Sequence, residues 1–248
     1  MIKLKRPEEI RIMQSGGKIL RGVVEQLVPW VRGGMTTKQV DDEATRLIRA
    51  AGADLSFAQV KGYHWATCLP VNEQIVHTIP GSRVLKDQDV LTIDIGCYYR
   101  GFHTDYATTF TIGPANPRVR RFLEAGRTAL GRAIKAAARG SYLGEVSRTI
   151  EQTINHAGYA VVEELTGHGI GRELHEEPYI PGKPIGPLTK TDKICAGMAL
   201  AIEVIYAEGG AAIAYEPDGW SIATADSSLS ACFEKTIAVT DKNTIVLT

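Results

Sequence analysis

Four acidic residues each interrupt an apolar, strand-like run of the sequence. Asp94 stands in DVLTIDIGCYY, Asp105 in FHTDYATTFTIG, Glu203 in ALAIEVIY and Glu234 in ACFEKTIAV. Burying unpaired carboxylates is very costly, so four of them in strands that should be buried require compensating cations. Carboxylate ligands of this number can hold two divalent metal ions close together, and such a pair acidifies a water molecule near neutral pH. The pattern predicts a carboxylate-rich dinuclear metal site.

His168 is the fifth candidate ligand. It lies in TGHGIG, where glycines on both sides let the backbone approach closely and leave the imidazole free to project. One glycine-flanked histidine is more often structural, but the four acids favour a ligand. Four carboxylates, two divalent ions and a bridging hydroxide leave about one negative charge, which suits a cationic substrate group such as an ammonium.

A β-hairpin over residues 90–111 must position the first two acids. Two alternating runs of β-branched and aromatic residues flank the turn-like pair Arg100-Gly101. With an even number of turn residues, position 96 lies opposite 105 and position 94 opposite 107, so Asp94 and Asp105 share one face as diagonal neighbours. The other face is apolar and suited to a core, and it carries Leu91, Ile93, Ile95, Tyr106, Thr108 and Phe110. The alternative is a solvent-facing edge with two charges.

The remaining elements follow from periodicity and capping signals. Helices are predicted over residues 7–28, ended by Pro29, and over residues 37–51, 117–139 and 144–156. Further strands are predicted at 159–162, 199–206, 211–215, 221–223 and 232–239, and a Pro/Gly-rich loop at 178–187. Helices lead into acid-bearing strands in both halves. We therefore expect one α+β domain over residues 1–248, with a pseudo-repeat of helices and strands.

Composition excludes several classes of protein. Lys plus Arg and Asp plus Glu both number 28, so no bulk affinity for nucleic acid or membrane follows. Cys68, Cys97, Cys195 and Cys232 are widely spaced and are expected to be reduced core residues. There is no apolar signal-peptide core and no apolar run near ~18 residues. We expect a soluble, cytoplasmic protein.

Several motifs together resemble the type I methionine aminopeptidases, which have the pita-bread fold. The matching segments are HTIPG from His77, IDIG around Asp94, HTDYATTF around Asp105, GHGIGRELHEEP with His168 and His175, IEV at Glu203, and SLSACFEKTI at Glu234. They span nearly the whole chain. The short gap between His168 and Glu203 leaves no room for the helical insertion of the type II enzymes.

This resemblance implies a role for each matching residue. Asp94 would chelate one metal, Asp105 and Glu234 would bridge both, and His168 and Glu203 would complete the other. His77 and His175 would be catalytic, one contacting the scissile amide and the other stabilising the oxyanion, and Glu203 would shuttle the proton. The ligand set accepts Mn, Fe, Co or Zn alike, so metal identity stays open.

The resemblance also implies a pocket for methionine beside the metals. Its lining would be Phe57, Val60, Tyr63, Cys68, His77, Leu174, His175 and Trp220. The expected function is removal of the N-terminal methionine from nascent proteins by a monomer. The sequence departs from the family pattern at Val204, where Pro is usual, at Thr78, where Gly is usual, and at Leu174, where an aromatic residue is usual. None of these changes removes a ligand.

Two alternatives remain open at this point. A Xaa-Pro aminopeptidase or dipeptidase of the same fold would use the same five ligands, although those enzymes usually carry an extra N-terminal domain. A non-catalytic pita-bread binding protein should have lost ligands, and here all five remain.

Residues outside the motifs carry two further expectations. A basic strip on the helix after Pro117 could dock transiently on ribosomal RNA, against the alternative of a solvated helix face; the strip comprises Arg118, Arg121, Arg132, Lys135 and Arg139. Among the other histidines, His64 and His156 are assigned to surface or loop and His103 to the rim of the hairpin face.

Overall fold

The computed structural model describes all of residues 1–248, and four helices form one layer of it. They are α1 (Pro7–Trp30), α2 (Thr37–Ala50), α3 (Pro117–Ala136) and α4 (Leu143–His156), with short 3₁₀ turns η1 (Phe57–Gln59) and η2 (Leu188–Lys190). Side-chain caps start two of them, because Thr36 accepts a hydrogen bond from the Gln39 N–H and Asn116 accepts one from the Val119 N–H.

The strands form a ten-stranded sheet and a three-stranded sheet, and every pairing is antiparallel. The large sheet contains β1 (Asp54–Leu55), β2 (Thr67–Cys68), β4 (Val90–Tyr99), β5 (Phe102–Thr111), β6 (Ala160–Val161), β7 (Thr166–Gly169), β8 (Glu176–Pro181), β9 (Ala199–Ala207), β12 (Ser230–Val239) and β13 (Thr244–Val246). Its main order is β1-β4-β5-β12-β9-β7-β8. The small sheet has β3 (Gln74–Val76), β10 (Ile213–Tyr215) and β11 (Ile222–Thr224).

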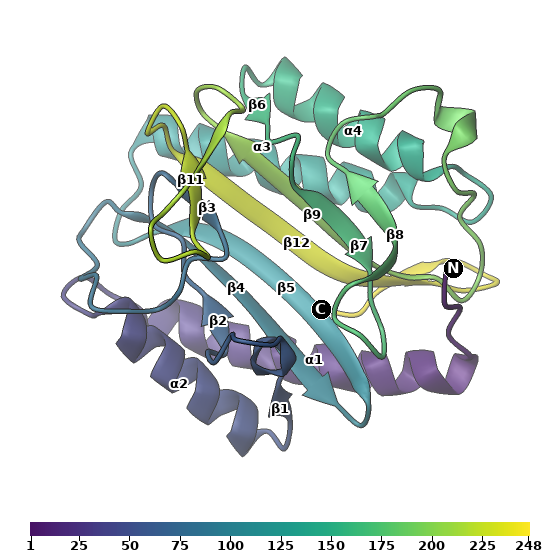
Figure 1. Cartoon of the computed structure of the whole chain (residues 1–248), viewed down its shortest axis with the longest axis horizontal. Coiled ribbons are helices and arrows are strands. Elements are labelled where there is room, and N and C mark those ends of the chain that lie inside the picture. Colours follow the sequence, from purple (N-terminus) through teal and green to yellow (C-terminus); the bar gives the residue numbers. More distant parts are fainter.

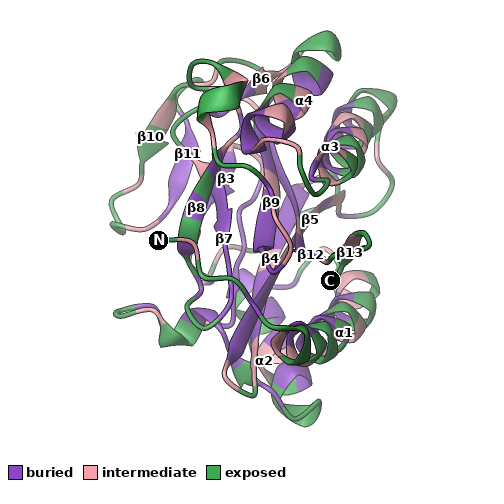
Figure 2. Cartoon of the chain, turned by 90° about the vertical axis from the view of Figure 1, so that its right-hand side faces the viewer, coloured by how far each residue is buried: buried purple, intermediate pink, exposed green.

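The helices cover one face of the large sheet in two pairs. In Figure 1, α1 runs behind β4 and β5 with α2 beside it, and α3 runs behind β9 and β12 with α4 beside it. Each helix pair packs into its own apolar cluster, one centred on Phe122, Ile150 and Tyr206 and the other on Leu20, Ile48 and Ile93. In the side view of Figure 2, the helices lie to one side of the buried strands, and β8, β10 and β11 lie on the other. The helix-free face is therefore the one available to a site.

The hairpin register is the one predicted. Asp94 pairs with Ala107 and Gly96 pairs with Asp105, so the two acids are diagonal neighbours on one face. Arg100 and Gly101 both have positive φ, 49° and 89°, as expected for the two central residues of a type I′ turn. The opposite face contributes Leu91, Ile93 and Ile95 to the core beneath α1 and α2.

Three predictions about elements were wrong, and a few short strands were not predicted. Helix α1 continues through Pro29 to Trp30, because a proline in the last turn sacrifices only one intrahelical hydrogen bond. Helix α3 ends at Ala136 rather than near Arg139, and β13 was not predicted. Part of the predicted 178–187 loop is strand β8, which pairs with β7 alone. An edge strand tolerates prolines such as Pro178, because its outer N–H groups need no partner strand.

His103 was placed at the rim of the hairpin face, and this was also wrong. It is buried, and its Nδ1 lies 2.7 Å from the Ser56 Oγ. All four cysteines are free, as expected, although Cys195 is only partly buried. None of the helices combines the length and the apolar character that crossing a membrane requires.

Candidate active site

A row of side chains across four adjacent strands builds the site. Asp94 on β4 pairs with Ala107 on β5, Ala107 pairs with Glu234 on β12, and Glu234 pairs with Glu203 on β9. Directly paired residues of an antiparallel sheet present their side chains on the same face. The small Ala107 therefore lies between acids on both sides, and like-charged Glu234 and Glu203 stand directly opposite each other.

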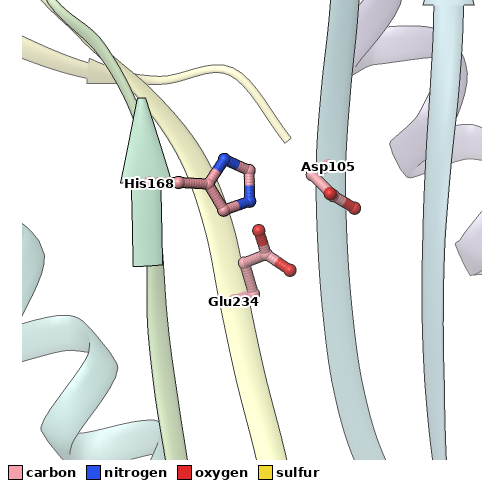
Figure 3. Close-up of side chains that lie close together, drawn as sticks. All are labelled: Asp105, His168 and Glu234. Atoms are coloured by element: carbon pink, nitrogen blue, oxygen red, sulfur yellow. The ribbon is translucent and has the colours of Figure 1, made fainter. Parts of the chain in front are cut away.

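The two remaining candidate ligands lie on the same face as this row, because side chains two residues apart on a strand point to the same side of the sheet. Asp105 lies two residues from Ala107 on β5, and His168 on β7 pairs with Ala201, two residues from Glu203. Figure 3 shows the Glu234 carboxylate between the His168 ring and the Asp105 side chain, which come from three different strands. One ligand atom from each of these three buried residues lies within 4.8 Å of the others. Glu203 Oε1 is 3.5 Å from His168 Nε2.

The electrostatics of this group favour a bound cation. Asp105 and Glu234 are buried, whereas Asp94 and Glu203 stay partly open to the pocket. Loss of hydration raises the pKa of all four carboxyl groups, and the negative charges of their neighbours raise it further. Glu234 Oε1 is buried without any hydrogen-bond partner. Cations bound in the row would offset the repulsion between the carboxylates and would give Glu234 Oε1 a partner.

His168 is a neutral imidazole whose Nε2 is free to bind a cation. Burial lowers its pKa to about 3, so the ring is uncharged at neutral pH. Its Nδ1 lies 2.8 Å from the Gly169 carbonyl oxygen, which places the proton on Nδ1. Nε2 then directs a lone pair toward the acids. A histidine held by a backbone carbonyl in this way is the usual arrangement of a metal-binding imidazole. The donor set therefore fits divalent metal ions.

The acid row opens into a pocket of about 150 Å³. Its walls are Phe57, Val60, Tyr63, Cys68, Val76, His77, Asp94, Asp105, His168, Leu174, His175, Glu203, Trp220 and Glu234. All five predicted ligands, both predicted catalytic histidines and all the predicted pocket residues thus lie around one cavity. Asp94 and Glu203 lie outside the group of three that shares the 4.8 Å limit, but they border the same cavity.

Hydrogen bonds and ring packing hold the apolar end of the pocket together. The Tyr63 hydroxyl donates to the Thr67 carbonyl oxygen at 2.7 Å and lies 3.1 Å from the Cys68 Sγ. Tyr63 also packs edge-on against Trp220, with 5.2 Å between ring centroids. Burial raises the pKa of the Cys68 thiol well above its ordinary value, so this wall is uncharged. The pocket has a charged end and a neutral aromatic end.

His77 and His175 are exposed within the cavity, unlike His168. The backbone of His77 has a φ of 57°, in the left-handed region that few residues other than glycine, asparagine and aspartate adopt. The His175 ring lies edge-on to the His168 ring, with 4.4 Å between centroids. Both catalytic candidates can therefore reach a ligand in the pocket.

Sequence reasoning missed two contributors. Val76 lines the pocket and directly precedes His77, which was the signal available for it. The Thr236 hydroxyl accepts a hydrogen bond from the Asp105 N–H at 2.8 Å and donates one to the Asp105 carbonyl at 2.9 Å. Thr236 stands two residues after Glu234, so the period of a strand places both on the same face.

Comparisons with known proteins show the family to which the chain belongs. A model of metallopeptidase family M24 matches residues 11–241. The chain is 38% identical to methionine aminopeptidase 1 of Bacillus subtilis, over 100% of this chain and 99% of that protein. It is 37% identical, over the same shares, to a methionine aminopeptidase of Clostridium perfringens.

Solved structures give the same result for the fold. The crystal structure of a Thermotoga maritima methionine aminopeptidase superposes with a TM-score of 0.96 at 33% identity, covering 100% of this chain and 99% of that chain. A prolidase from Pyrococcus furiosus gives a TM-score of 0.78 at 22% identity, covering 98% of this chain but only 64% of the prolidase. The pita-bread α+β fold expected from the sequence is thereby confirmed. The family match and the full-length relatives show that this chain belongs to metallopeptidase family M24.

Proposed function

We propose that this chain is a metal-dependent aminopeptidase that removes the N-terminal methionine of nascent proteins. The observation that carries the proposal is the direct opening of the acid row into an apolar, aromatic pocket. One end suits a free ammonium group and the other suits an unbranched thioether, whose contact with Tyr63 or Trp220 is worth up to about 1.5 kcal/mol. Relatives that cover the whole chain are named methionine aminopeptidases.

We further propose that two divalent ions, of Mn, Fe, Co or Zn, occupy the row. Their ligands would be Asp94, Asp105, His168, Glu203 and Glu234. Four carboxylates balance two divalent charges, which supports the number. When bound, such a pair acidifies water near neutral pH and polarises the substrate carbonyl.

Protein side chains perform the remaining steps in this proposal. Asp94 borders the pocket, and its partly open carboxylate attracts the substrate ammonium. Glu203 is partly open to the pocket, so its carboxylate can accept a proton from the attacking water and deliver it to the leaving amine. His77 and His175 donate hydrogen bonds to the scissile amide and to the oxygen that becomes negatively charged.

Substrate choice is the direct test of this function. We expect turnover of a Met-Ala peptide, while Leu-Ala should lose about 1–3 kcal/mol of transition-state stabilisation because the pocket discriminates by shape. N-acetyl-Met-Ala should not be cleaved, because it lacks the ammonium group. Met-Lys should be slow, because the second residue must pass between His77 and His175. Peptide release under one metal condition measures all four.

An Ala-Pro peptide and a metal-free sample complete the same experiment. Equal cleavage of Met-Ala, Leu-Ala and the acetylated peptide would contradict methionine specificity. Preference for Ala-Pro would instead favour the Xaa-Pro alternative, and no cleavage by the metal-loaded protein would favour a binding protein.

We propose also that residues 1–248 act as a single catalytic domain, as a monomer in the cytoplasm. The candidate ligands come from β4 and β5 in one half and from β7, β9 and β12 in the other, so neither half holds a complete set. The four free cysteines agree with a reducing compartment.

A transient contact with ribosomal RNA is a separate proposal and rests on the basic strip, whose first four residues lie on α3 and whose last, Arg139, follows its end. Arg118 pairs with Glu208 at 2.6 Å and Arg139 pairs with Asp241 at 3.2 Å, which neutralises the two ends of the strip. Its central members, Arg121, Arg132 and Lys135, are exposed and form no ion pair. Their spacing places them near one face of the helix, where they could neutralise phosphates.

Reversal of this charge should release the protein from ribosomes. We expect co-sedimentation at low salt to fall in the triple variant R121E/R132E/K135E, because each lost phosphate contact weakens binding. The matched control R11E/K18E/R49E changes three exposed, unpaired basic residues of α1 and α2. Equal loss in both variants, or no dependence on salt, would end the proposal.

A further inference from the structure

The loop of residues 171–176, which joins β7 to β8 and carries Leu174 and His175, is fastened to the N-terminal segment before α1. Lys5 Nζ lies 2.5 Å from Glu176 Oε2, and the two side chains are only 5% and 1% exposed. A second pair, Lys3 to Glu173 at 2.6 Å, joins the same segments at the surface, where its side chains are 51% and 66% exposed. The Lys5–Glu176 pair is thus the buried one.

Hydrogen bonds within the loop and to Lys5 surround the Lys5 ammonium. Lys5 Nζ also donates to the Lys3 carbonyl at 2.8 Å, while the second oxygen of Glu176 accepts the Glu173 N–H at 3.2 Å. The Gly171 N–H donates to the Glu173 carbonyl at 3.1 Å. A Cβ at Gly171 would overlap Lys5 Cε, so any larger residue there would require the Lys5 side chain to shift.

Lys5 and Gly171 also form backbone hydrogen bonds with segments next to or within the strands that build the site. The Lys5 N–H donates to the Gly197 carbonyl at 2.7 Å, just before β9, the strand of Glu203. The His103 N–H on β5 donates to the Gly171 carbonyl at 2.7 Å. Lys5 therefore connects the loop to the same framework that holds the acid row.

Glu176 directly follows His175 in the chain, so a displacement of Glu176 would also displace His175. A buried carboxylate that loses its cation is strongly destabilised and moves toward water if the backbone allows it. Such movement would draw the neighbouring His175 away from its place beside His168. A misplacement of about 1 Å at a catalytic group can cost on the order of 10²-fold in rate.

We propose that Lys5 is a positioning residue, which acts through Glu176 to hold His175 and Leu174 at the pocket. This rests on the proposed function in one respect, the role of His175 in turnover. Nothing in the sequence pattern separated Lys5 from the other basic residues near the start of the chain. Its part is visible only in the fold, where residue 5 meets residue 176.

The first test is Lys5→Met, which keeps the length of the side chain and removes the charge. We expect kcat for a Met-Ala peptide to fall about 10-fold, with the metal content per chain unchanged. Lys3→Met is the matched control and should stay within about twofold of wild type, because exposed ion pairs contribute little. The double variant Lys5→Met/Glu176→Gln should recover part of the lost rate, because no buried charge is left unpaired.

A second arm distinguishes positioning from general destabilisation. If Lys5 acts through His175, Lys5→Met should cost less than about twofold in a His175→Ala background, since coupled residues are not additive. An equal loss in both backgrounds would overturn the proposal. If Lys5→Met does not fold, Glu176→Gln tests the same pair with side-chain volume preserved.

The final measurement, amide hydrogen exchange, does not depend on catalytic activity. Backbone amides of residues 171–176 should exchange hydrogen faster in metal-free Lys5→Met than in wild type and in Lys3→Met, while those of β9 and β12 should not change. Unchanged exchange in the loop would refute the positioning role. If the wild type fails to release methionine, the proposed function falls, yet this exchange experiment still decides whether Lys5 holds the loop.

Discussion

We expect Asp105→Ala to abolish turnover and to lower the metal content of the protein. Asp105 is buried and belongs to the group of ligand atoms within 4.8 Å that includes His168 and Glu234. As a proposed bridge it serves both ions, so its loss removes one ligand from each and leaves the other acids without charge compensation. The rate should fall by roughly 10³-fold or more. Turnover of a Met-Ala peptide and elemental analysis after dialysis measure the two effects.

Two further variants test whether the expected loss of activity comes from the Asp105 carboxylate itself. Asp105→Asn keeps the side-chain volume, so it should be equally inactive, but it should raise the melting temperature of the metal-free protein at neutral pH. The raised pKa of Asp105 means that its ionised form destabilises the folded chain, and Asn removes that charge. Asp54→Ala changes an exposed acid on β1 and should retain wild-type activity. Near-normal activity of Asp105→Ala with two bound metals would refute the assignment.

His175→Ala should keep the metals and still lose about 10²–10³-fold in kcat, as removal of an oxyanion donor usually does. The side chain is exposed in the pocket, and its ring packs against the ring of His168 without belonging to the group of three ligands. Peptide turnover and metal content, measured on the same preparation, test this prediction.

The control for His175 is His156→Ala, at the exposed end of α4, which should leave both quantities unchanged. Loss of metal from His175→Ala would make His175 a ligand. An unchanged rate would remove it from the mechanism.

The part of the site that the sequence predicted best is the hairpin. The two-residue turn at Arg100-Gly101 determines the register locally, and the period of two then places Asp94 and Asp105 on one face. The pairing of Glu234 with Glu203 and Ala107 has no such local signal, because these strands lie far apart in the chain. Their approach was expected from the shared pattern of acids in apolar strands and from a family resemblance, whereas the structure explains it by strand order.

The errors share a physical cause, which is tertiary contact that overrides local preference. Pro178 and the residues around it have the composition of a loop, but pairing with β7 makes them an edge strand. His103 has the polarity of a rim residue, but Ser56 and its neighbours cover it and give its ring a partner. Lys5 carries no local signal that separates it from the other basic residues near the start of the chain, and only the fold brings it beside Glu176.

The position of β12 has a consequence for how the chain folds. This strand lies between β5 and β9, although it is synthesised after both of them. The centre of the large sheet therefore stays open until a late segment inserts between two earlier ones, a topology with high contact order that slows folding. Because Glu234 arrives with β12, the proposed set of ligands is complete only in the finished fold. A metal ion bound to this set would stabilise the native state against all partly folded ones, so metal supply would help determine how much of the chain persists in the folded form.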